Sequence, residues 1–139
     1  MNSSGADLLA WKKSYETGIE EIDLQHHYFL TLINKLNQAF GQDHNEIYLH
    51  RLLEELIHYA QFHFISEENM MFAIGYPQLK EHSAHHSDLI DRVRMKSNLV
   101  ELDQIKATEV VDFLYEWFVN HTLHEDMLIA EFQRNPGEV

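Results

Sequence analysis

The chain has 139 residues, enough for one domain with a substantial core, and its net charge of −13 argues against nucleic acid, whose phosphates select basic surfaces. It contains no cysteine, which excludes disulfides, thiolate metal sites and iron–sulfur clusters. No apolar run approaches the roughly 20 residues of a membrane span, and the first residues lack the pattern of a secretory signal. We therefore expect a cytoplasmic protein that does not enter a membrane.

Four segments of the chain show the apolar periodicity of amphipathic helices. They lie at about residues 24–40, 45–74, 77–98 and 104–132. Asp23 is a candidate N-cap for the first segment, and Gly41 and Gly75 are placed to end the first and the second. Because short connections make neighbouring helices antiparallel, these segments predict an all-α protein, an up-down-up-down four-helix bundle with an N-terminal arm.

The bundle is expected to occupy residues 23–133. Residues 1–22 would form the arm, which packs on the bundle through Trp11 and Tyr15. Residues 134–139 contain a proline and a glycine directly after the last helix, so they are expected to be a tail or a linker.

Polar side chains interrupt the apolar stripes at matching places in the four segments. They are His26 near the start of the first, His63 and Glu67 late in the second, His82 and His86 at the start of the third, and His121 late in the fourth. In an alternating bundle these four places meet at one end. Since an unpaired buried carboxylate is costly, five histidines and a carboxylate gathered inside a core predict a bound metal.

The ligand types narrow the choice of metal without settling it. Nitrogen-rich ligation with carboxylates suits iron, zinc, copper or nickel. A ferritin-like di-iron enzyme would need two Glu-x-x-His motifs, and this chain has one, from Glu55 to His58. His58 stands roughly 140° from the face of His63 on helical geometry, so we discard that motif.

The other polar residues near the stripes have a simpler interpretation. Those expected in solvent are His27, His44, His50, His58 and Glu68. His85 points about 100° away from His86. His124, one turn after His121, is the one rival candidate. We expect at most that it supports a metal ligand without binding the metal itself.

Several stretches carry a resemblance to a known family. They are Trp11, Ile22-Asp23-Leu24-Gln25-His26, the run from His63 to Glu68, Gly75-Tyr76-Pro77, the run from His82 to His86, and the run from His121 to Asp126. Together they span nearly the whole chain, which resembles a bacterial hemerythrin. The resemblance implies two iron ions joined by an oxo or hydroxo group. The implied ligands are His82, His86 and His121 for one iron, His26 and His63 for the other, and Glu67 and Asp126 as bridges between both.

Asp126 does not fit a regular helix as a partner of His121. The two residues are five apart, which places them about 140° from each other, whereas Glu125 would share the face of His121. The family pattern uses the five-residue spacing, so we follow it. The geometry then requires a local distortion such as a π-bulge, a feature common at functional sites.

The implied ligand count leaves one iron position open, on the iron with two histidines, and in the family dioxygen binds there. The side chains expected to line this oxygen pocket are Phe29, Phe64, Trp117 and Phe118. Phe118 departs from the family, in which a smaller aliphatic side chain is usual at this position.

The expected function is reversible binding of dioxygen without catalysis. The protein would act as an oxygen carrier or store, or as the oxygen- or redox-sensing domain of a larger protein with a C-terminal signalling module. The alternative is a di-iron oxidase or peroxidase, which would need a proton donor beside the open iron. The residues expected there are apolar or nearly so, which favours the binding protein.

Overall fold

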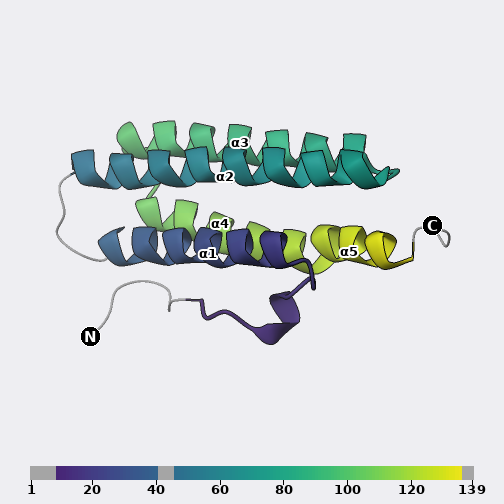
Figure 1. Ribbon diagram of the computed structural model, residues 1–139. Coiled ribbons are helices and arrows are strands. Elements are labelled where there is room, and N and C mark those ends of the chain that lie inside the picture. Colours follow the sequence, from purple (N-terminus) through teal and green to yellow (C-terminus); the bar gives the residue numbers. More distant parts are fainter. Residues whose placement is uncertain (1–8, 41–45, 136–139) are drawn as a thin grey trace.

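The computed structural model describes residues 9–40 and 46–135, and these residues form two layers of helices (Figure 1). A short 3₁₀ turn, η1 (Lys13–Tyr15), precedes the bundle. The helices of the bundle are α1 (Glu20–Phe40), α2 (Glu46–Ile74), α3 (Leu79–Glu101), α4 (Ala107–Asn120), the π-helical turn η2 (His121–Asp126) and α5 (Met127–Arg134). Because α4, η2 and α5 follow one another without a break, they act as one fourth helix.

The four helices alternate in direction, as the colours of Figure 1 show along the chain. α1 packs against α2 and α4, and α3 packs against the same two helices. The predicted all-α, up-down-up-down bundle is therefore confirmed. The start of α1, the end of α2, the start of α3 and the turn η2 all lie toward the same end of the bundle. We call this the site end and the other the distal end. None of the described helices is long and apolar enough to cross a membrane.

The start of α1 differs from the prediction. The helix begins at Glu20, so Asp23 lies within its first turn and is not the N-cap. The Asp23 carboxylate accepts hydrogen bonds from the backbone N–H groups of Thr17 (2.8 Å) and Gly18 (3.1 Å) and from the Thr17 hydroxyl (2.8 Å). A short acidic side chain therefore anchors the arm to the helix. Gly41, residues 1–8 of the expected arm and residues 136–139 of the expected tail lie outside the described residues.

The apolar side chains inside the bundle form two clusters of unequal size. The larger one fills the distal end and the middle, with Leu36, Leu56, Val110 and Leu114 almost inaccessible to solvent. A smaller cluster closes the site end, formed by Met71, Tyr76, Ile129 and Phe132. The polar residues predicted to bind metal precede this smaller cluster along α2 and the fourth helix. They therefore lie in a polar layer with apolar packing on both sides.

Candidate metal centre

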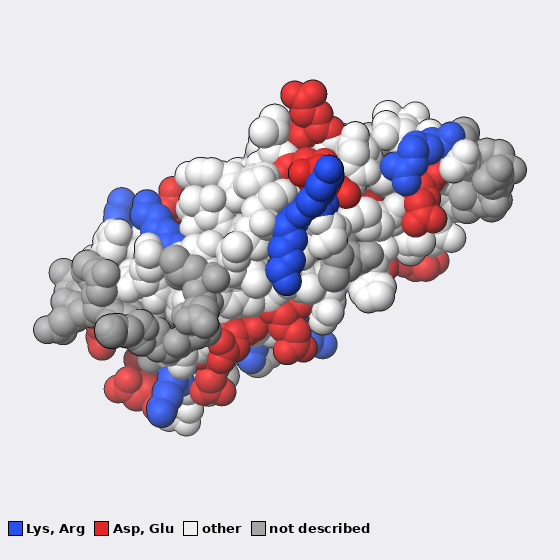
Figure 2. Space-filling view, turned by 90° about the horizontal axis from the view of Figure 1, so that it is seen from below, with Lys and Arg blue, Asp and Glu red and all other residues white. Residues whose placement is uncertain are grey.

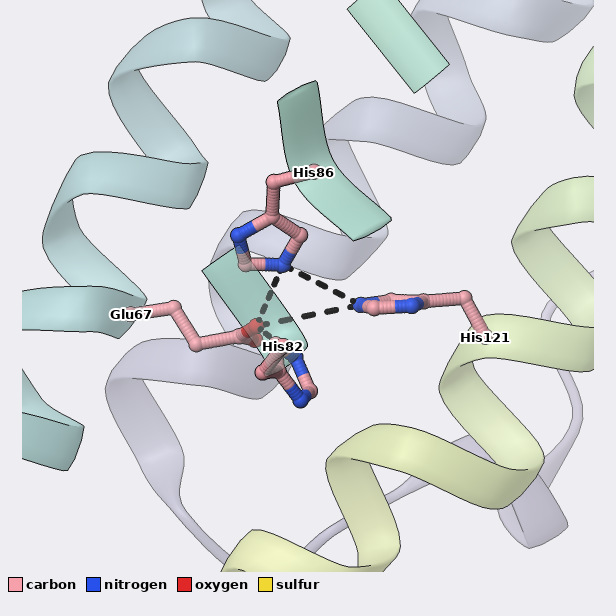
Figure 3. Close-up of side chains that lie close together, drawn as sticks. All are labelled: Glu67, His82, His86 and His121. Atoms are coloured by element: carbon pink, nitrogen blue, oxygen red, sulfur yellow. Dashed lines mark hydrogen bonds and ion pairs between the residues drawn. The ribbon is translucent and has the colours of Figure 1, made fainter. Parts of the chain in front are cut away.

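Seven polar side chains from the four helices of the bundle meet in this layer. They are His26 from α1, His63 and Glu67 from α2, His82 and His86 from α3, and His121 and Asp126 from η2. Each is at most 5% exposed. Figure 3 shows four of them, Glu67, His82, His86 and His121, pointing toward one another from three helices. The structure thus brings together the whole set of predicted ligands.

Three histidines, which we call the three-histidine group, lie on one side of the layer (His82, His86 and His121). Their Nε2 atoms approach Glu67 Oε1 at 2.9, 3.0 and 3.8 Å respectively. Nε2 of His82 and of His121 also lie 3.1 and 3.0 Å from Asp126 Oδ1. One oxygen of each carboxylate therefore faces this group.

The other two histidines, which we call the two-histidine group, face the second oxygen of each carboxylate. His63 Nε2 and His26 Nε2 lie 3.5 and 3.9 Å from Glu67 Oε2, and His26 Nε2 lies 2.7 Å from Asp126 Oδ2. The ligand atoms form two clusters that could each hold a metal ion, and Glu67 belongs to both. Two carboxylates with one oxygen toward each cluster are arranged as bridges between two ions.

The π-helical turn η2 places Asp126 in this layer. Hydrogen bonds from residue i to residue i+5 make each turn about one residue longer than in an α-helix, so residues five apart share a face. His121 and Asp126 are the first and last residues of η2. The predicted distortion between them is confirmed. Glu125 is instead turned to the side, where its carboxylate pairs with the exposed His85.

The two carboxylates are held in their charged form by the histidines around them. Burial and the neighbouring Asp126 both act to raise the pKa of Glu67, but hydrogen bonds from His121, His82 and His86 outweigh them and lower it. Burial also acts to raise the pKa of Asp126, but the charge of the neighbouring His121 outweighs it and lowers that pKa well below its usual range.

The pKa values of the buried histidines shift in two directions. Burial opposes a charge on His82 and His121, but their carboxylate partners raise the pKa of His82 to about 9 and that of His121 to about 10. Burial lowers the pKa of His63 to about 4. At neutral pH, therefore, two protonated imidazoles supply the positive charge that the buried carboxylates require when no cation is bound.

Several buried polar atoms of this layer meet no partner in hydrogen-bond geometry within the described residues, although some of them lie within ion-pair distance of one another. They are Glu67 Oε2, both carboxylate oxygens of Asp126, and both ring nitrogens of His26. A buried polar atom without a partner costs free energy, and four of these five atoms face the centre, His26 Nδ1 being the exception. Imidazole nitrogens with carboxylate oxygens suit iron and other first-row transition metals. The residues present therefore fit two metal ions.

Two residues behind the histidines were missed by the sequence interpretation. The Gln25 side-chain oxygen accepts a hydrogen bond from Nδ1 of His63 at 2.6 Å, and Glu68 accepts one from Nδ1 of His86 at 2.7 Å. The expectation that Glu68 is solvated was wrong, because the side chain folds back onto His86 and is only 28% exposed. Its place directly after Glu67 in α2 was the one available signal.

The four aromatic residues predicted to line an oxygen pocket lie close to the centre but on different sides. Phe64 stacks on His86 with ring centroids 3.9 Å apart, and Trp117 stacks on His121 at 4.3 Å. Phe29 and Phe118 face the two-histidine group, with Phe118 6.0 Å from His26 and Phe29 6.5 Å from His63.

The remaining described histidines stay outside the layer. Those on the surface are His27, His50, His58, His85 and His124. His27 stacks on Trp11 of the arm, with ring centroids 3.8 Å apart. His44 lies outside the described residues.

Comparison with known proteins gives matches over most of the chain. A family model described as the hemerythrin HHE cation binding domain matches residues 17–132. A bacteriohemerythrin of Clostridium acetobutylicum is 32% identical over 127 residues, which cover 86% of this chain and 96% of that protein. A myohemerythrin of Theromyzon tessulatum is 27% identical over 111 residues, covering 80% and 82%.

Comparison of the fold with solved structures also finds hemerythrin. A crystal structure of wild-type hemerythrin superimposes with a TM-score of 0.81 at 26% sequence identity. The superposition covers 90% of this chain and 97% of that one.

Proposed function

The chain belongs to the hemerythrin family, and from this premise we propose that it holds two iron ions and binds dioxygen reversibly. When bound, two ferrous ions supply the electrons that reversible binding of dioxygen requires. The proposed ligands are those predicted from the sequence, with Glu67 and Asp126 as bridges. An oxo or hydroxo group is proposed as a third bridge.

The observation that carries this proposal is the placement of the carboxylate oxygens. Glu67 and Asp126 each present one oxygen to the three-histidine group and the other to the two-histidine group. A site for one ion would need only one such cluster. The unequal number of histidines then leaves the ion beside His26 and His63 with one ligand fewer, which is the place proposed for dioxygen.

Apolar rings shield this side of the centre. Phe29 and Phe118 are 1% and 0% exposed, and their centroids lie 6.0 Å apart in an edge-to-face contact. Tyr15 of the arm makes an edge-to-face contact with Phe118, with ring centroids 5.7 Å apart. Excluding water from a reactive centre suppresses proton delivery and side reactions, so these rings support binding over oxidation chemistry. We therefore propose that the protein is not an enzyme.

Both a carrier or store and a sensing domain would use the same reversible binding. A C-terminal signalling module and a cytoplasmic location remain predictions. Nucleic acid is not proposed as a partner: on the face drawn in Figure 2, basic side chains stand in small separate groups among acidic ones. Binding to nucleic acid would need a continuous basic surface.

Metal analysis is the first test. Purified protein loaded with Fe²⁺ under anaerobic conditions should retain about two irons per chain, because five imidazoles and two bridges exceed the coordination sphere of one ion. A single tightly held zinc in fresh protein, with no iron uptake after its removal, would contradict the proposal.

The second test measures reversibility. Di-ferrous protein is exposed to a known amount of dioxygen, and the gas is then removed under vacuum. We expect most of the gas to be recovered and the spectrum of the reduced protein to return. Prompt conversion to the di-ferric form with peroxide in solution would reject reversible binding and leave a redox-switched sensor or an oxidase.

A further inference from the structure

We propose that Gln25 and Glu68 are positioning residues that make the two iron sites electronically unequal. The inference rests on the proposed di-iron function and deepens it. Gln25 places a neutral amide behind a histidine of the two-histidine group, whereas Glu68 places a carboxylate behind a histidine of the three-histidine group. The iron with the open position would thereby have the weaker donors and favour the ferrous state, which is the state that dioxygen requires.

The orientation of the Gln25 amide is determined by its neighbours. Its Nε2 donates to the hydroxyl of Ser66 (3.2 Å), and that hydroxyl donates to the Glu21 carboxylate (3.3 Å). Since Ser66 has its single proton directed to Glu21, it can only accept from Gln25. The amide oxygen must therefore face His63, where it accepts the Nδ1–H at 2.6 Å. Nε2 of His63 is left with a lone pair for a metal.

The backbone around Gln25 supports this arrangement. Gln25 is buried on α1, and its carbonyl oxygen accepts a hydrogen bond from the hydroxyl of Tyr59 on α2 at 3.2 Å. The side chain and the backbone of Gln25 thus both bind α2, the helix that carries His63. The hydrogen bonds that continue from Gln25 through Ser66 end at the surface carboxylate of Glu21, three hydrogen bonds away from the His63 imidazole.

Glu68 acts on its histidine directly. Its Oε2 lies 2.7 Å from Nδ1 of His86, and Phe64 stacks on the face of the same ring. The two contacts together fix the orientation of the His86 imidazole. A carboxylate acceptor polarises the N–H bond more than an amide does, which raises the basicity of the coordinating nitrogen. A more basic imidazole stabilises the more highly charged metal ion.

His26, the other histidine of the two-histidine group, adds to the difference between the two iron sites. Nδ1 of His26 has no hydrogen-bond partner within the described residues. The two-histidine group is therefore supported by one neutral amide, and the three-histidine group by a carboxylate. The distinction is one of charge, since the two hydrogen bonds have nearly equal lengths.

Reciprocal exchanges test the inference, because Gln25→Glu and Glu68→Gln keep the shape and an acceptor oxygen while changing the charge. Matched controls are Gln38→Glu and Glu55→Gln, which make the same charge changes at exposed positions of the same two helices. The measurements are irons per chain and the midpoint potential of the di-iron centre by spectroelectrochemistry.

We expect Gln25→Glu to lower the midpoint potential and Glu68→Gln to raise it, with both controls close to the unmodified protein. Each of the two exchanges should retain two irons. Alanine at either position, which removes the acceptor, should weaken iron binding by about 10- to 100-fold in competition with a chelator.

A role in orientation alone would leave the potential unchanged in both exchanges, and that result would overturn the inference while the proposed function stands. Shifts in the same direction, shifts matched by the surface controls, or loss of iron from either exchange would overturn it too. If the unmodified protein fails to hold two irons, the proposed function fails and this inference fails with it.

Discussion

Side chains are buried to the same degree at the two ends of the bundle, but they are apolar at the distal end and charged at the site end. At the distal end Leu36, Leu56 and Leu114 are at most 1% exposed, and at the site end Glu67 and Asp126 are equally inaccessible. Burial of the leucines is favourable by itself, at about 25 cal/mol per Å² of apolar surface. Burial of the carboxylates is favourable only with compensating positive charge. One end therefore stabilises the fold, and the other depends on what it binds.

The largest effect that tests this contrast is expected from Glu67→Ala. Glu67 belongs to both clusters of ligand atoms, so its removal should abolish stable binding of both irons. Metal analysis after desalting measures the loss. Glu55→Ala, at an exposed position of the same helix, is the matched control and should retain two irons. A Glu67 variant that still holds two irons would remove the bridge from the proposed centre.

The next effect separates two histidines on the same end of the molecule. His86→Ala should cost at least one of the two irons, because His86 lies 3.0 Å from Glu67 and has its own supporting carboxylate. His124→Ala should cost none, because His124 is exposed. The readout is again irons per chain. Equal losses would show that the ligands of η2 have been misassigned.

Leu114→Ala tests the distal end. It removes a fully buried side chain of the larger apolar cluster, and such truncations cost about 2–5 kcal/mol of unfolding free energy. Urea unfolding of the iron-loaded protein measures this loss. The variant should still bind two irons, since the site end has its own packing on both sides. Loss of iron from a variant that is still fully folded would show that the two ends are strongly coupled.

The smallest effect concerns protons. In the metal-free protein the pKa values of His82 and His121 are raised to about 9 and about 10, so both imidazoles are protonated at pH 7. Their stabilising contribution is complete below the ordinary histidine pKa and is lost as pH rises through 9 to 10. A metal must displace both protons. Binding of Fe²⁺ near pH 7 should therefore release at least two protons per chain, measured with an indicator dye, and affinity should rise with pH. A pH-independent affinity would contradict these protonation states.

Most of the candidate centre could be predicted because its residues interrupt a regular pattern. A histidine on an apolar stripe is visible in the sequence, and the alternation of helices assigns each one to an end of the bundle. Asp126 was reached through the family resemblance, and its five-residue separation from His121 correctly required a π-helical turn. Asp23 was misread because a carboxylate at a helix start can bind either the helix amides or, as here, the chain that precedes them.

By itself, the sequence determined the number and order of the helices, the end at which the polar residues gather and the identity of the candidate ligands. Except for Asp126, which the family resemblance supplied, these follow from periodicity, short connections and residue type, which are local properties. Only the tertiary structure decided which carboxylate oxygen faces which group of histidines, and that Gln25 and Glu68 stand behind different imidazoles. Such contacts join helices across the bundle and depend on side-chain rotamers and helix rotation to within an ångström, for which a periodic pattern contains no information.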